Sequence, residues 1–159
     1  MGRNEKANIV YPIDFGISKK YRDAHKHHIP FTDKKNLVGT ARYSSINDHL
    51  GYEQSRRDDM ESLGYMFVYF MKGRLPWQGI TGNDKKEKYM KILKKKQSLT
   101  CLELCDGLPI EFAQYIEMCR KLEFEEEPNY LEMRKMFWRV AKREKIQFDG
   151  DFDWLKLKK

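Results

Sequence analysis

Apolar side chains recur with a helical period over the second half of the chain. Three segments carry them three or four positions apart, the spacing of one face of a helix. These segments are residues 83–96, residues 109–121 and the stretch that follows Pro128. Seven lysines fill the other positions of the first segment, and we interpret most of them as a solvated face. The pattern predicts three amphipathic helices.

A fourth segment, residues 58–73, is apolar on all sides of the expected helix. It begins with two acidic residues, Asp58 and Asp59, and ends with Lys72 and Gly73, which are typical helix start and stop signals. A helix that is apolar all round is buried all round. We therefore expect this segment to be the central core helix.

The N-terminal third shows no helical period. Residues from Ile9 to Phe15 form a short apolar run, which predicts a strand. Pro12 lacks a backbone donor, so we expect an edge or hairpin strand. Basic, aromatic and turn residues are mixed from Ile17 to Asn47. This segment is predicted to be a long irregular surface loop, and such loops are usually functional or disordered.

Composition places these elements in one globular domain of the cell interior, cytoplasmic or nuclear. The chain has 159 residues, 40% hydrophobic and 35% charged. No apolar run reaches membrane-spanning length, and the N-terminus does not resemble a signal peptide. The three cysteines lack the paired spacing of a zinc site, and we expect reduced thiols. No carboxylate or cysteine pattern supports a metal site at the histidines of residues 25–28.

The net charge of +7 indicates an acidic partner. Nucleic acid, a phosphoprotein and an anionic membrane satisfy this charge equally well. Charge alone therefore leaves the class of partner open.

Several motifs together resemble the casein kinase I family of serine/threonine protein kinases. The tripeptide Asp14-Phe15-Gly16 resembles the magnesium-binding tripeptide of kinases. In order along the chain there follow "KNLVGTARYSSINDHLGYEQSRRDDMESLGY" (residues 35–65), "LPWQG" (75–79), "CRKLEFEEEPNY" (119–130) and "FDWLKLK" (152–158). Most kinases close the activation segment with Ala-Pro-Glu, whereas "SIN" (residues 45–47) is similar to this family. The resemblance covers essentially the whole chain.

The resemblance implies a mainly α fold, the C-terminal lobe of a kinase, with a short strand or hairpin at its N-terminal end. The activation segment would span about residues 14–47 and the helical lobe about residues 48–145. A tail of about residues 146–159 would dock onto the body through Phe152 and Trp154. We find no counterpart of the N-terminal lobe, of its Gly-rich loop and lysine, or of the catalytic Asp. A missing N-terminal half is therefore expected.

The resemblance also implies a nucleotide and metal site, with ATP and Mg²⁺ as cofactors of the complete kinase. Asp14 would bind Mg²⁺, a hard cation that prefers oxygen ligands. Ile13 would line the adenine pocket, and Phe15 can pack inward. Thr40 would hydrogen-bond the catalytic Asp, and Asp59 would anchor the catalytic loop through backbone amides.

The family favours acidic or phosphorylated protein substrates, which requires fixed cations near the peptide groove. Arg42 and Lys88 match its phosphate-binding pair, with the backbone of Gly79 nearby. A guanidinium fork and an ammonium suit a phosphate dianion. Lys19 and Lys35 match a further basic patch of the family.

Three hypotheses follow from these observations. The first is a fragment of a casein kinase I-like enzyme, which transfers the γ-phosphoryl of ATP to Ser/Thr when complete and is inactive as this chain alone. The second is a non-catalytic module that binds phosphorylated or acidic peptides. The third, a general polyanion or nucleic-acid binder, is less favoured because no nucleic-acid motif is present. On the first, the core helix would leave an apolar patch exposed, so that solubility is poor.

Overall fold

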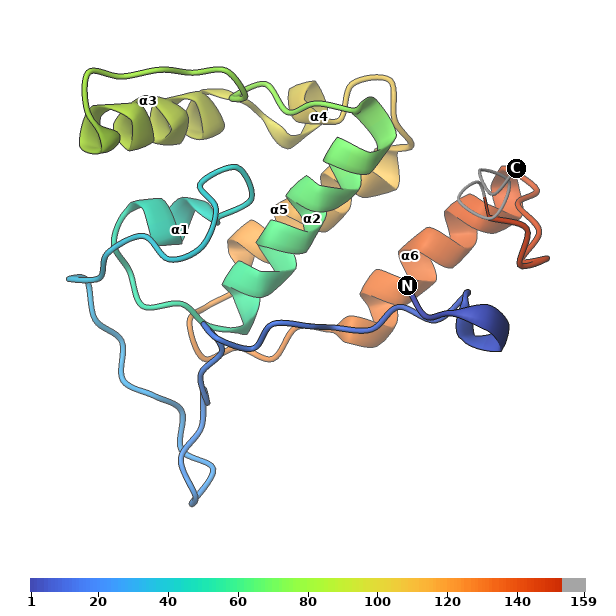
Figure 1. The fold of residues 1–159 in the computed structure, drawn as a ribbon, viewed down its shortest axis with the longest axis horizontal. Helices are drawn as coiled ribbons and strands as arrows, with labels where there is room; N and C mark the ends of the chain where they lie inside the picture. Colours follow the sequence, from blue (N-terminus) through green and yellow to red (C-terminus); the bar gives the residue numbers. More distant parts are fainter. Residues whose placement is uncertain (153–159) are drawn as a thin grey trace.

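The computed structural model describes residues 1–152 and is mainly helical. The elements are a 3₁₀ turn η1 (Asn4–Lys6) and the helices α1 (Ile46–His49), α2 (Arg56–Lys72), α3 (Lys85–Ser98), α4 (Cys101–Leu104), α5 (Ile110–Lys121) and α6 (Tyr130–Arg143). In Figure 1, α5 lies behind α2 at the centre, in contact with it, and α3 and α6 lie on opposite sides. The predicted docking of Trp154 falls on residues 153–159, outside the described residues.

Helix α2 is the core helix that the sequence predicts, although its burial is one-sided. Its first turn is capped by the carboxylate of Asp58, which accepts a hydrogen bond of 2.8 Å from the Ser55 amide. The helix ends at Gly73, whose φ of 75° is left-handed. The prediction of burial on all sides is wrong, because Phe70 is 68% exposed and Met71 is 56% exposed. Apolar side chains of α2 do therefore face solvent, as expected for an exposed patch.

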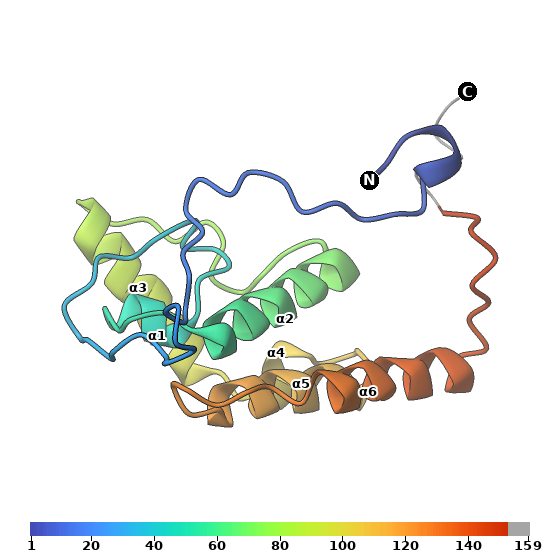
Figure 2. The same ribbon diagram turned by 90° about the horizontal axis from the view of Figure 1, so that it is seen from below.

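Helices α5 and α6 form the layer beneath α2 (Figure 2), and the sequence predicts both. Gly64 lets α2 approach α5 closely, because a Cβ at this position would lie 2.8 Å from Cγ1 of Ile116. Helix α6 packs on α5 through buried Met133 and Met136. The short helix α4 was not predicted.

Helix α3 is packed against α1 rather than against the α5–α6 layer. Asp84 caps it, accepting a hydrogen bond of 2.7 Å from the Glu87 amide. Ile92 is buried in the core and Lys88 is exposed. The charged face of α3 thus points to solvent beside the segment that precedes α1.

The predicted strand at Ile9–Phe15 is wrong: residues 1–152 contain no strand, only an isolated bridge between Arg22 and His28. Ile13 is 82% exposed and Phe15 is 68% exposed, so the expectation that Phe15 packs inward is wrong as well. A strand needs a neighbour to pair with, and the apolar run finds none in the described part of the chain. In Figure 2 this segment runs apart from the helices.

The long irregular loop is confirmed up to Ser45, after which α1 occupies the end of the predicted span. No helix in residues 1–152 is long and apolar enough to cross a membrane. The three cysteines are free thiols, as expected. Burial raises the pKa of Cys105 to about 11 and that of Cys119 to about 12.

Candidate anion-binding groove

Three separate segments enclose a groove of about 540 Å³ on the α3 side of the molecule. They are residues 39–42 of the long loop, residues 77–81 and the face of α3 that carries Lys88, Tyr89 and Ile92. Arg42, Gly79 and Lys88, matched above to a phosphate site, all line this groove, and Thr40 lines it too. The fold thus brings the three matched residues together.

The loop that carries Arg42 is held through its backbone carbonyl groups. The ammonium of Lys96 donates to the carbonyl of Ala41 at 3.0 Å and to that of Ser44 at 2.5 Å. The indole N–H of Trp77 donates to the carbonyl of Arg42 itself at 2.7 Å. The irregular loop is therefore held at three of its residues, 41, 42 and 44, while the Arg42 side chain remains exposed.

Lys96 is completely buried, contrary to the interpretation of the α3 lysines as solvated. Its ammonium lies over the rings of Tyr65 and Trp77, 4.9 and 5.0 Å from their centroids. Desolvation lowers the pKa of Lys96 to about 7, although the carboxylates of Glu61 and Asp48 oppose this shift. The sequence did contain a signal, because Lys96 lies four positions after the buried Ile92 on the same helix face.

The cations that face the groove have no acidic partner. Arg42 and Lys88 are exposed, and neither forms an ion pair with a carboxylate of residues 1–152. The guanidinium of Arg42 lies over the rings of Tyr43 and Tyr69, 5.7 and 5.5 Å from their centroids. Gly79 has a φ of 84°, and its amide donates no hydrogen bond within the described part. The groove therefore offers positive charge that no carboxylate of the described residues compensates, and a backbone amide without an acceptor among them.

Lys19 and Lys35, matched to a further basic patch, share one acidic partner, which compensates half of their charge. Both ammonium groups pair with the carboxylate of Glu53, that of Lys35 at 3.1 Å. The Glu53 side chain is only 10% exposed, which strengthens its hold on both partners. The sequence predicted that the two lysines lie in one basic patch. It did not predict that Glu53 pairs with both of them.

The residues assigned to the nucleotide and catalytic sites lie apart from this groove, except Thr40. Asp14 is exposed with a left-handed φ of 61°, and its Oδ1 accepts a hydrogen bond of 3.3 Å from the Gly16 amide. Asp59 lies in the first turn of α2, facing a second hollow that Lys19 also lines. Desolvation and the neighbouring Asp58 raise the pKa of Asp59. Among residues 1–152, no three His, Cys, Asp or Glu side chains gather as metal ligands would.

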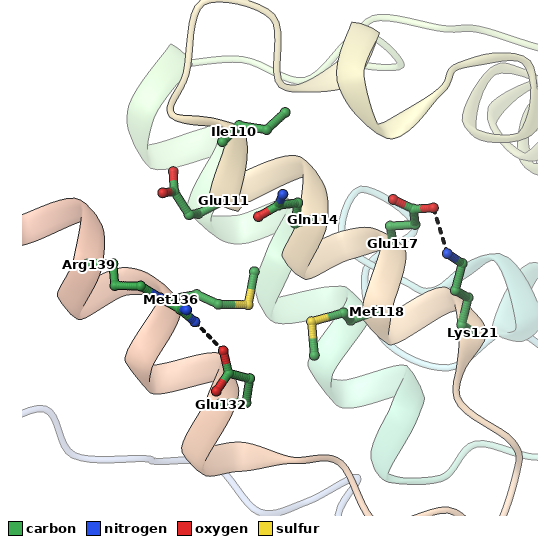
Figure 3. Close-up of a pocket in the computed structure, with 9 residues that line it drawn as sticks. All are labelled: Ile110, Glu111, Gln114, Glu117, Met118, Lys121, Glu132, Met136 and Arg139. Atoms are coloured by element: carbon green, nitrogen blue, oxygen red, sulfur yellow. Dashed lines mark hydrogen bonds and ion pairs between the residues drawn. The ribbon is translucent and has the colours of Figure 1, made fainter. Parts of the chain in front are cut away.

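A further hollow of about 500 Å³ lies between α5 and α6, and Figure 3 shows the side chains that line it. Its floor carries the thioethers of Met118 and Met136. Each of its glutamates pairs with a basic side chain: Glu111 with Arg143, Glu117 with Lys121 and Glu132 with Arg139. Its charges are thus compensated internally, and it is less suited to a charged ligand than the Arg42 groove.

No protein-family model matches this chain. The two cations of the groove without acidic partners are therefore the feature that indicates a function.

Proposed function

We propose that this chain binds phosphorylated or acidic segments of other proteins in the groove that Arg42, Gly79 and Lys88 line. The observation that carries the proposal is the convergence of these three residues from separate segments on one hollow. Two cations without acidic partners, next to a backbone amide without an acceptor, form a suitable environment for a phosphate.

The chemistry of the three groups is complementary. A guanidinium presents parallel N–H donors to two phosphate oxygens, whereas an ammonium adds a compact point charge. A phosphorylated side chain carries about −1.5 to −2 charges at pH 7 and three acceptor oxygens, enough to engage all three groups. A single carboxylate offers less charge and fewer acceptors. The groove should therefore prefer phosphate, while still accepting clusters of Asp and Glu.

The motifs of the sequence support a second part of the proposal, that this binding surface belongs to a casein kinase I-like serine/threonine kinase. In the complete enzyme, Asp14 would contribute to Mg²⁺ binding and Ile13 to the adenine pocket, and ATP would supply the phosphoryl group. These 159 residues contain neither a Gly-rich loop nor a recognisable catalytic Asp motif. We therefore propose that this chain recognises the substrate and does not itself transfer phosphate.

The alternative candidate is a module that binds phosphopeptides without belonging to an active enzyme. The same groove favours it, because binding there needs no nucleotide. A phosphotransfer assay on the longest natural polypeptide that contains this chain separates the two candidates. Phosphorylation of a Ser/Thr peptide supports the kinase, and its absence despite phosphopeptide binding supports the module.

Calorimetric titration with a Ser peptide, phosphorylated and unphosphorylated, tests the binding function. We expect preference for the phosphorylated form, and each of Arg42→Gln and Lys88→Met should lower that affinity by about tenfold, the value of one charge-assisted hydrogen bond. Lys94→Met is the matched control, since it removes an exposed charge from the same helix outside the groove. Equal affinity for both peptides, or loss of all binding at moderate salt, would show unspecific attraction instead.

A further inference from the structure

We infer that Lys96 is the positioning residue of the Arg42 groove: its buried ammonium joins the loop that carries Arg42 to the helix that carries Lys88. This inference rests on the proposed phosphate-binding function. It assigns to Lys96 no contact with the ligand, only the placing of the two cations that make that contact.

Lys88 and Lys96 of α3 differ in burial. Lys88 is exposed in the groove, and Lys96, about 12 Å further along the helix at 1.5 Å per residue, is completely buried. From there its ammonium reaches the carbonyl groups of Ala41 and Ser44, on either side of Arg42. A shift of the loop relative to α3 would break both hydrogen bonds. The spacing between Arg42 and Lys88 is set through this contact.

Trp77 extends the same contact to the third side of the groove. The Lys96 ammonium lies over its ring in a cation–π contact, and its indole N–H donates a hydrogen bond to the carbonyl of Arg42. Trp77 lies two residues before Gly79, which lines the same groove. The loop, the turn and α3 therefore meet at one buried cation. A groove built from three segments far apart in sequence needs such a common point.

Stability alone does not account for a buried ammonium at this position. Taking a charge out of water costs several kcal/mol, and well-packed apolar residues often replace buried charges without loss. Lys96 also faces charged groups from three helices, Asp48 of α1, Glu61 of α2 and Arg120 of α5. The loop carbonyl groups of Ala41 and Ser44 and the faces of two aromatic rings surround it in return. Such an arrangement holds an irregular loop in one conformation, which a methionine of similar length would not do.

A double-mutant cycle with the phosphorylated Ser peptide tests this inference. Lys96→Met should weaken binding by about tenfold in the wild-type background, and by less than about twofold when Arg42→Gln is already present. The difference arises because a misplaced Arg42 and an absent Arg42 remove the same contact. General destabilisation would lower the affinity equally in both backgrounds. Lys94→Met again controls for the loss of one positive charge.

The outcomes separate the inference from the proposed function. A wild-type chain without preference for the phosphopeptide overturns both. A wild-type preference that Lys96→Met leaves unchanged, or reduces equally in both backgrounds, overturns the inference alone. If Lys96→Met does not fold, Trp77→Phe takes its place, because it keeps an aromatic ring at this position and removes the hydrogen bond to the carbonyl of Arg42. Its loss of affinity should likewise disappear with Arg42→Gln, and an unchanged affinity would overturn the inference.

Discussion

Replacing Lys96 by methionine should change how the free energy of unfolding depends on pH. In the folded protein, desolvation lowers the pKa of Lys96 from 10.5 to about 7. Between these pH values the unfolded chain binds one proton more than the folded chain, so stability rises with pH. Below pH 7 both states hold the proton, and the full cost of the buried charge is present. The total difference corresponds to about 5 kcal/mol, at about 1.4 kcal/mol for each tenfold change in proton affinity.

Urea unfolding of wild type and Lys96→Met between pH 6 and 8.5 measures this contribution. The stability of wild type relative to the variant should increase by about 2 kcal/mol over that range. At pH 6, two opposing effects decide which of the two proteins is more stable. The variant loses two hydrogen bonds, but it no longer buries a charge. Taking the difference between the two proteins removes the titration of groups that do not interact with Lys96; His49, whose pKa Lys96 lowers, does not cancel in this way. A difference that stays constant with pH, or falls, would refute the idea that the Lys96 ammonium is desolvated.

Three further predictions concern other parts of the molecule. Gly64→Ala should lower the free energy of unfolding by about 1–3 kcal/mol in urea melts, because its Cβ would meet Cγ1 of Ile116 at 2.8 Å; unchanged stability would mean that α5 yields easily. Glu53→Gln should release two paired lysines and raise the salt concentration at which the chain elutes from heparin, and earlier elution would contradict this. The purified chain should transfer no labelled phosphate from ATP to a Ser/Thr peptide; a transfer that Asp14→Asn abolishes would contradict our assignment.

The helices were predictable because their signals are local. The spacing of apolar residues in α5 and α6 depends only on the helical period, and Pro109 and Pro128 mark their starts. The N-terminal strand was not predictable, since strand formation depends on a pairing partner that an apolar run does not specify. The exposure of Phe70 was not predicted for a similar reason. The sequence pattern shows that a helix is apolar, but it does not show how many of its sides contact other elements.

The residues that line the groove could be predicted from the sequence, but the buried residues that hold these segments in place could not. The resemblance selected Arg42, Gly79 and Lys88, and the fold brings them to one hollow. Lys96 was missed because lysine is almost never buried completely, so a lysine-rich segment is ordinarily taken as a solvated surface. Glu53 was missed because nothing in its sequence neighbourhood indicates two ammonium partners from distant loop positions.

The extended segment from Ile9 to Phe15 has one consequence for handling the protein. Within the described part, its main-chain hydrogen bonds reach only residues 2–18, so none of them supports a helix of the body. A protease could accommodate this stretch in its cleft without first unfolding anything else. Cleavage there would leave the helices α1 to α6 on a single uncut polypeptide.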